Sequence, residues 1–172
     1  MPVRKKSKQV SRAQLAKIKL VILDVDGVMT DGRMVYGVNG VEMKFFDVYD
    51  GFGITRAIDK GLRLAVISRG ESDISLRRAR ALGIPDIVQR SLDKLKTAEE
   101  IMAKYQIAAS EVCFIGDDEY DLGLLRAAGI GVAPRTAYPP VLAEVDIVTK
   151  AAGGRGAVRE VLDLILKAKK LI

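Results

Sequence analysis

Short apolar runs alternate with helical segments along almost the whole chain. The runs are continuous, which is typical of strands buried on both faces of a sheet, and they span residues 20–23, 62–68, 87–88, 112–115, 130–132 and 147–148. Helical patterns lie between or after them, at residues 54–60, 74–82, 94–105, 122–128 and 157–169. Glycine follows three of these helices, at the position that a helix C-cap favours. The alternation predicts an α/β fold, a Rossmann-like parallel sheet with helices on both faces.

The length and composition of the chain fit one domain with one core. It has 172 residues, of which 49% are hydrophobic and 29% are charged, as in ordinary globular proteins. Residues 1–17 are predicted to be a basic N-terminal tail and a short helix, because Ser11 and Gln14 have capping-box spacing. Residues 18–172 are predicted to form the single domain.

One segment departs from the alternation directly after the first predicted strand. Residues 34–36 and 41–46 flank the glycine-bounded turn Gly37-Val38-Asn39-Gly40, which predicts a β-hairpin insertion. An isolated two-stranded ribbon is barely stable in water. We therefore expect the hairpin to pack either on its own domain or on another subunit.

The positive charge of the chain is concentrated at its ends. Residues 1–19 carry seven Lys and Arg and no acid, and residues 167–172 carry three Lys and no acid, so the remainder is mildly acidic although the net charge is +6. Nucleic-acid binding requires basic residues across a folded face, so we expect no nucleic-acid partner. No apolar run is long enough to span a membrane and no apolar signal segment follows the basic start. The single cysteine makes no internal disulfide, which favours a cytoplasmic location.

The chain contains no histidine. This excludes Ser-His-Asp and Cys-His catalysis, histidine general bases and histidine zinc sites. Any catalysis must use carboxylates, lysine, hydroxyl groups or a metal ion held by oxygen.

Polar residues follow the predicted strands, where the ligand site of an open α/β sheet is expected. They are Asp24-Val25-Asp26-Gly27 after the first strand, Ser68-Arg69-Gly70 after the second, Lys94 after the third, and Gly116-Asp117-Asp118 with Asp121 after the fourth. Each piece alone is explained by a turn, a helix cap or a surface charge. Together, so many carboxylates in one region require a cation to neutralise them. Oxygen ligands alone favour magnesium.

These motifs resemble those of a known superfamily. The sequence from Leu23 to Gly32, LDVDGVMTDG, resembles the first motif of the haloacid dehalogenase superfamily of phosphatases. Ser68 matches its second motif, Lys94 its third, and residues 116–121 its fourth. Residues 18–165 are most similar to the capless 3-deoxy-D-manno-octulosonate 8-phosphate phosphatases, and the likeness includes the hairpin, residues 50–54 and the tail of residues 153–160.

The resemblance implies a magnesium-dependent phosphatase that acts through an aspartyl-phosphate. It makes Asp24 the nucleophile and Asp26 the acid that protonates the leaving oxygen and then the base that activates water. It places Mg²⁺ on the Asp24 carboxylate, the Asp26 backbone carbonyl and Asp117. It assigns Ser68 and Lys94 to the phosphoryl oxygens.

The resemblance also implies supporting residues, a substrate and an assembly. Asp118 and Asp121 would orient Lys94 and the metal-bound waters. The substrate would be a phosphorylated sugar acid, 3-deoxy-D-manno-octulosonate 8-phosphate, a precursor of lipopolysaccharide. Arg69 and Arg155 are candidates to bind its carboxylate, as substrate-binding residues beside Asp26, Ser68 and Lys94. The family forms homotetramers in which the hairpins pack together, so we expect a tetramer.

Two departures and three alternatives accompany this prediction. Arg69 precedes Gly70 where the family usually has glycine and then arginine, and Tyr49 stands where it commonly has arginine. Both positions lie where the sugar and its carboxylate would bind. One alternative is the same chemistry on another sugar phosphate, such as a sialic-type nine-carbon acid. A second is a catalytically silent oligomerisation module, against which the intact motifs argue, and a third is a nucleic-acid 3′-phosphatase that uses the basic tails.

Overall fold

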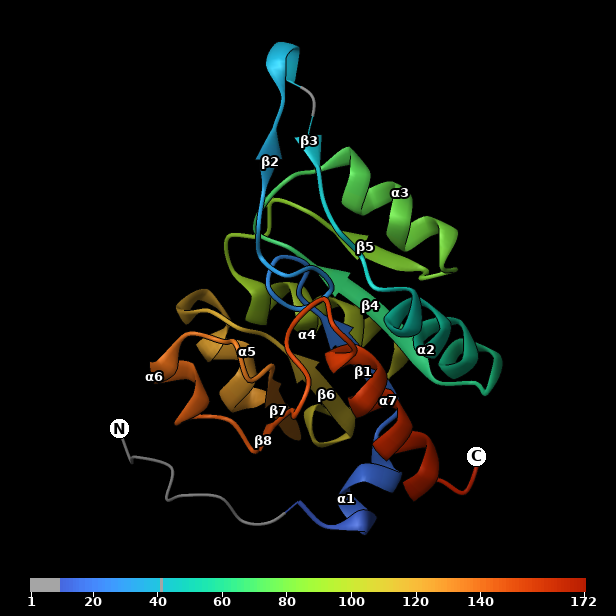
Figure 1. Cartoon of the computed structure of the whole chain (residues 1–172). Helices are drawn as coiled ribbons and strands as arrows, with labels where there is room; N and C mark the ends of the chain where they lie inside the picture. Colours follow the sequence, from blue (N-terminus) through green and yellow to red (C-terminus); the bar gives the residue numbers. More distant parts are fainter. Residues whose placement is uncertain (1–9, 41) are drawn as a thin grey trace.

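A six-stranded parallel sheet forms the centre of the molecule (Figure 1). The structure, a computed structural model, describes residues 10–40 and 42–172. The strand order is β5-β4-β1-β6-β7-β8, with bounds β1 Leu20–Leu23, β4 Arg63–Ile67, β5 Asp86–Val88, β6 Val112–Ile115, β7 Ile130–Ala133 and β8 Ile147–Val148. All five pairings are parallel. The predicted α/β fold is confirmed, and each predicted strand is present to within one or two residues.

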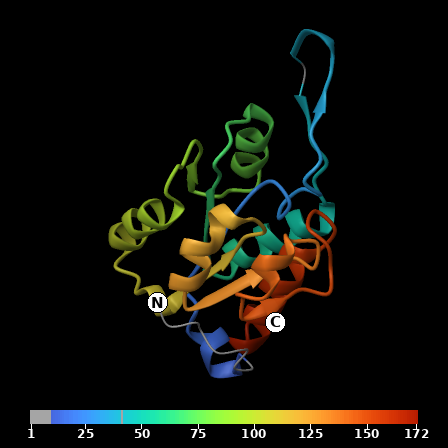
Figure 2. The same cartoon turned by 90° about the vertical axis from the view of Figure 1, so that its left-hand side faces the viewer.

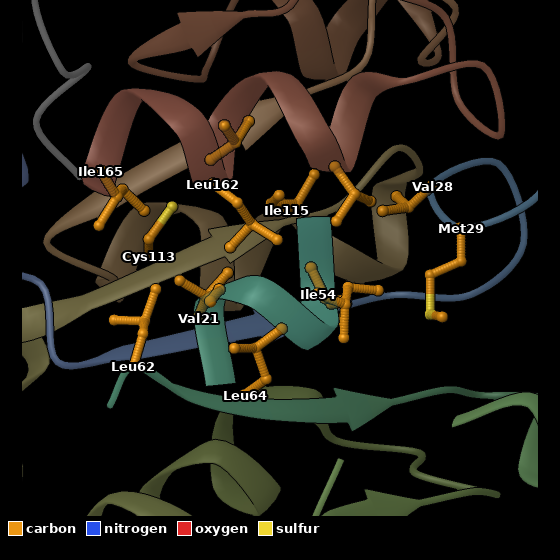
Figure 3. Packing of buried hydrophobic residues seen from close by; sticks show 14 of the residues in the cluster. Val21, Val28, Met29, Ile54, Leu62, Leu64, Cys113, Ile115, Leu162 and Ile165 are labelled. Carbon is orange, nitrogen blue, oxygen red and sulfur yellow. The ribbon is translucent and has the colours of Figure 1, made fainter. Parts of the chain in front are cut away.

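Helices cover both faces of this sheet (Figures 1 and 2). The helices are α1 Arg12–Lys17, α2 Val48–Asp59, α3 Asp73–Ala81, α4 Lys94–Tyr105, α5 Leu122–Ala127, α6 Pro139–Leu142 and α7 Ala157–Ala168, with 3₁₀ turns η1 Val38–Gly40, η2 Ala109–Glu111 and η3 Glu119–Asp121. Side chains alternate along a strand, so β1 serves two cores. Val21 and Leu23 pack with residues of α2, α3 and α7, whereas Leu20 and Ile22 pack with residues of α4, α5 and α6. Figure 3 shows part of the first core, where Val21 lies among Ile54, Leu64 and Leu162.

The short helix predicted before the first strand is confirmed as α1. The backbone N–H of Gln14 donates to the Ser11 hydroxyl, and the Ser11 N–H donates to the Gln14 side chain at 2.9 Å. Residues 1–9 of the predicted basic tail lie outside the described residues. Within the described chain, no helix is long and apolar enough to cross a membrane.

The predicted hairpin is present and extends away from the sheet (Figures 1 and 2). Strands β2 (Val35–Tyr36) and β3 (Glu42–Met43) are antiparallel, and η1 lies between them. Its apolar side chains are exposed to solvent in the single chain: Met34, Val35, Tyr36, Val38, Met43 and Phe45. The base of the ribbon is held by a bridge between Thr30 and Phe46.

Candidate active site

The carboxyl ends of the central strands meet around one pocket. Strand β1 lies between β4 and β6 and is parallel to both. The residues that follow these three strands therefore come together at the carboxyl edge of the sheet. The pocket has a volume of about 350 Å³ and is lined by Asp24, Asp26, Gly32, Ser68, Arg69, Gly70, Lys94, Asp117, Asp118, Tyr120 and Asp121. Every site residue predicted from the sequence lines this pocket except Arg155.

Lys94 joins two of the buried carboxylates. It is the first residue of α4, which Asp93 caps by accepting a hydrogen bond from Lys96 N–H. Its Nζ lies 2.7 Å from Asp24 Oδ1 and 2.6 Å from Asp121 Oδ1. Burial alone would lower the pKa of Lys94, but the attraction of the two carboxylates outweighs burial and raises it. Lys94 is therefore a fixed cation inside the pocket.

Asp24 directly follows β1, and Asp24 N–H donates to Ile115 O at 3.0 Å. The backbone thus fixes the carboxylate at the centre of the sheet, where it is only 7% exposed. Burial raises the pKa of Asp24 to about 6, against the attraction of Lys94. One carboxylate oxygen, Oδ1, accepts from Lys94, and the carboxylate lines the pocket, where a metal ion or a phosphorus atom would meet it.

Asp117 and the neighbouring carboxylates form a set of oxygen ligands. Oxygen atoms of Asp24, Asp117 and Asp121 all lie within 4.8 Å of one another. Burial, and then repulsion by Asp24 and Asp121, raises the pKa of Asp117 to about 8. No donor in the described chain hydrogen-bonds the Asp117 carboxylate. A divalent cation would relieve this crowding, and oxygen ligands suit Mg²⁺.

Asp121 supports the pocket and is less available to a metal ion. Its Oδ1 accepts from Lys94, and its Oδ2 accepts from the backbone N–H groups of Asp117 and Asp118. The Asp118 carboxylate accepts from Glu119 N–H at the start of η3. The residues present therefore fit a cation held by Asp24 and Asp117, with Asp121 orienting Lys94.

The backbone of the first motif is shaped around Asp117. Gly27 has φ of +84°, and a Cβ atom at this position would lie 1.9 Å from Asp117 Oδ2. Only glycine combines this left-handed conformation with such close approach. The turn after β1 and the loop after β6 are thus packed directly on each other.

Asp26 is held by a lysine that the sequence analysis did not single out. Lys44 Nζ donates to Asp26 Oδ1 at 2.8 Å and to Oδ2 at 3.2 Å. Lys44 follows β3 at the base of the hairpin, and its side chain is 3% exposed. In the sequence Lys44 stands between Met43 and Phe45 in the predicted hairpin. A lysine at such a position ordinarily indicates a solvent-exposed side chain, so nothing in the sequence indicated a role in the site.

Ser68 and Arg69, which directly follow β4, also line the pocket. Ser68 is buried, and its N–H donates to Val88 O while its carbonyl accepts from Ser91 N–H. The Arg69 guanidinium stacks on the Tyr120 ring at 3.5 Å from its centre. The arginine is thereby fixed at the rim of the pocket, where an anionic group of a ligand would meet it.

The glycine-rich tail packs on the first-motif loop. A Cβ at Gly153 would lie 1.7 Å from Gly27 O, and one at Gly154 would lie 2.4 Å from Thr30 C. Arg155 lies 3.7 Å from Asp31 and its side chain is 64% exposed. Asp50 accepts hydrogen bonds from Gly156 N–H and Arg159 N–H at the start of α7. The tail thus borders the site, with Arg155 outside the pocket itself.

The fold and the site together define a class of phosphate-processing hydrolases. Its features here are a parallel sheet, Asp24 and Asp26 after β1, a lysine in contact with Asp24, and an acidic loop after β6. Residues 76–162 match the haloacid dehalogenase-like hydrolase family. The chain is 40% identical to the 3-deoxy-D-manno-octulosonate 8-phosphate phosphatase of Escherichia coli K12 over 157 residues, which are 91% of this chain and 84% of that protein. It belongs to the 3-deoxy-D-manno-octulosonate 8-phosphate phosphatase family, as the resemblance predicted.

Solved structures agree with this assignment. The Yersinia pestis phosphatase of this name superposes with a TM-score of 0.91 at 41% identity, covering 92% of this chain and 86% of that one. The Moraxella catarrhalis phosphatase superposes with a TM-score of 0.90 at 40% identity, covering 92% and 91%. The latter was solved in complex with a magnesium ion, a phosphate ion and the sugar acid.

Proposed function

We propose that this protein hydrolyses 3-deoxy-D-manno-octulosonate 8-phosphate to the free sugar acid and inorganic phosphate, a step in the synthesis of lipopolysaccharide precursors. The observation that carries the proposal is the complete set of Asp24, Asp26, Lys94 and Asp117 around one pocket. A silent relative would have no need to keep a buried lysine between two carboxylates. The similarity to the Moraxella catarrhalis enzyme, solved with phosphate and the sugar acid, supports the substrate.

In the proposed first step, Asp24 attacks phosphorus through the carboxylate oxygen that Lys94 does not contact. The bond between phosphorus and the sugar oxygen breaks, and Asp26 gives its proton to that leaving oxygen. In the second step, water attacks the phosphorus of the aspartyl-phosphate, Asp26 takes the proton of the water, and the Asp24 carboxylate is regenerated. The position of Asp24 at the end of β1 supports the first role, and the partial exposure of Asp26, 36% for its side chain, supports the second.

Charge neutralisation is divided between a cation and the chain. Mg²⁺ held by Asp24, Asp117 and the Asp26 backbone carbonyl would offset the repulsion between the nucleophile and the phosphate. Lys94 and Ser68 would bind the phosphoryl oxygens, because both are buried and both line the pocket. Asp121 keeps Lys94 in place, 2.6 Å away, and Asp118 shapes the loop.

The sugar-acid carboxylate requires a further cation. Arg69 is proposed for this role because it lines the pocket and is fixed on Tyr120. Arg155 is proposed to close on the ligand from the tail. Its guanidinium is exposed and 3.7 Å from Asp31, so a ligand carboxylate could replace that weak ion pair.

We further propose that the protein is a cytoplasmic homotetramer assembled through the hairpin. The exposed apolar side chains of residues 34–45 support this proposal, since such a group on a projecting ribbon favours contact with another copy. The pocket is open to solvent, and a neighbouring subunit would exclude water from it.

The substrate proposal is tested by the release of phosphate. With Mg²⁺ present, kcat/KM for the eight-carbon sugar-acid phosphate should exceed that for 4-nitrophenyl phosphate and for the 9-phosphate of a sialic-type acid. A higher value for the nine-carbon substrate would identify the other sugar phosphate as the substrate. Equal values for all three esters would refute specificity for a sugar acid.

A further inference from the structure

Lys44 is a buried cation outside the motifs that define the phosphatase. It belongs to the segment that leads from the exposed hairpin back to α2, yet its side chain is only 3% exposed. Its ammonium group reaches into the site and contacts both oxygens of Asp26, at 2.8 and 3.2 Å. No other donor of the described chain hydrogen-bonds the Asp26 carboxylate.

Lys44 is itself held from the other side by Glu42. Glu42 Oε1 lies 3.2 Å from Lys44 Nζ, and Glu42 Oε2 accepts a hydrogen bond from the Ser72 hydroxyl at 2.9 Å. Ser72 is buried and caps α3, accepting from Ser75 N–H. A continuous polar chain therefore runs from the start of α3 through the base of the hairpin to Asp26.

The burial of the Lys44 side chain is costly unless its charge is paired. An ammonium group removed from water loses several kcal/mol of hydration, and a fixed lysine side chain loses up to about 2 kcal/mol of conformational freedom. Contacts with two carboxylates offset these costs only in the geometry observed. The arrangement thus fixes the orientation of the Asp26 carboxylate, which has no other hydrogen-bond donor among the described residues.

We propose that Lys44 is the positioning residue for Asp26, so that the base of the hairpin holds the proton donor toward the leaving oxygen. This inference rests on the role given to Asp26 in the proposed function. Asp24, Asp117 and Lys94 make no hydrogen bond or ion pair with Lys44 among the described residues, so loss of Lys44 should leave these three side chains in place. Cleavage of the phosphate ester bond should then slow most for the leaving groups that depend most on protonation.

Two aryl esters separate this role from a general structural one. Phenyl phosphate and 4-nitrophenyl phosphate are similar in shape and have no carboxylate, but phenolate is the more basic leaving group and needs the proton more. Their kcat/KM values report the step that breaks the ester bond, whatever the rate of the later hydrolysis. Both are to be measured with Mg²⁺ for the wild-type protein and for Lys44→Met, which keeps an unbranched side chain without the charge.

In Lys44→Met, kcat/KM for phenyl phosphate should fall by about 10- to 100-fold, a part of what general acid catalysis contributes. For 4-nitrophenyl phosphate it should fall by less than about threefold. Lys44→Arg keeps a cation and should recover most of the loss, and Glu42→Gln should lie between. The matched control is Lys96→Met, an exposed lysine of α4, which should behave as the wild type.

Equal losses on both esters, or no loss on either, would overturn the proposal. Thermal unfolding of each variant shows whether the protein is folded, and Lys44→Arg provides the comparison if Lys44→Met is not. A crystal structure of a Lys44 variant gives a test that needs no turnover, because the Asp26 carboxyl should leave its observed orientation. If the wild-type protein hydrolyses no phosphate ester, the proposed function fails, whereas an unmoved Asp26 refutes the role of Lys44 alone.

Discussion

Lys94 offsets part of the negative charge of the pocket. Three carboxylates, those of Asp24, Asp117 and Asp121, lie within 4.8 Å of one another, and Lys94 contacts two of them. Removing either partner of a buried ion pair leaves the other charge uncompensated. A single lysine does not neutralise three carboxylates, and the remaining excess is what attracts a divalent cation.

Replacement of the nucleophile should separate catalysis from folding. Asp24→Asn preserves the shape of the side chain and can still accept a hydrogen bond from Lys94, but it removes the attacking charge. We expect kcat to fall by about 1,000-fold or more, while the circular dichroism spectrum and the thermal midpoint change little. Near-normal turnover by the purified variant would contradict the assignment.

Removal of the metal ion should be visible in both activity and stability. A chelator should abolish phosphate release and added Mg²⁺ should restore it, while Ca²⁺, which prefers more ligands at longer distances, should restore it poorly. Mg²⁺ should also raise the unfolding temperature, because it binds the folded chain only. Asp117→Asn should lose that rise. Full activity in metal-stripped protein would rule out the metal site.

At the scale of elements, the strands could be predicted because each contains a continuous apolar run, the longest of which lie in strands between two neighbours of the sheet. The helix α2 was predicted only from Ile54, whereas it begins at Val48. Its first turns contain Gly51 and Gly53, which ordinarily weaken a helix. These glycines serve packing, since a Cβ there would lie 2.3 Å from Arg78 Nη2 and 2.7 Å from Arg159 Cδ. The need for glycine at these positions depends on contacts with distant residues, which the local sequence does not reveal.

The candidate site, too, could be predicted from the sequence only in part. Residues that directly follow strands, such as Asp24, Ser68 and Asp117, could be placed together because parallel strands end at one edge of the sheet. Lys44 could not, because it enters the site through a side chain folded back from a projecting ribbon. Arg155 was predicted near the site and lies at its border. The path of the tail there is set by the packing of Gly153 and Gly154 on the first-motif loop.

The junction of α2 and α7 should respond to pH through Asp50. Burial raises the pKa of Asp50 to about 6 from 3.8, although N–H donors of Arg159 and Gly156 oppose the shift. The folded protein therefore binds this proton more tightly than the unfolded chain. The contribution to stability is complete below about pH 4 and is lost as the pH rises through about 6.

We expect this difference in urea unfolding of the wild type and Asp50→Asn. Between pH 4 and pH 7 the wild type should lose about 2–3 kcal/mol more of its free energy of unfolding than the variant, following the two-unit shift. Asp59→Asn, an exposed position near the end of the same helix, is the control and should follow the wild type. Parallel pH profiles for wild type and Asp50→Asn would exclude a role for Asp50.

At the scale of the whole molecule, the domain has a compact sheet and one projecting arm (Figure 2). Tyr36 and Val38 on this arm are 70% and 90% exposed. Burial of such side chains contributes about 25 cal/mol for each Å² of apolar surface removed from water. Burial of this surface would stabilise the association of copies through the hairpin that we propose.

Light scattering should report four chains in the wild-type particle at micromolar concentration. Val38→Asp should dissociate it, because the charge would be buried in the interface. Val148→Asp, on the exposed side of edge strand β8 and 45% exposed, should leave the particle unchanged. A monomeric wild type would show that the hairpin does not assemble the protein.

The order of the site along the chain also governs when a newly made copy becomes active. Asp24 leaves the ribosome before its partner Lys94, which comes 70 residues later, and Asp117 and Asp121 come later still. The turn at residues 153–156, which packs on the first-motif loop, is made after all of these. A nascent or prematurely terminated chain therefore carries a nucleophile without the groups that activate it. We therefore expect incomplete copies to hydrolyse no phosphate ester, because the residues that complete the pocket are missing from them.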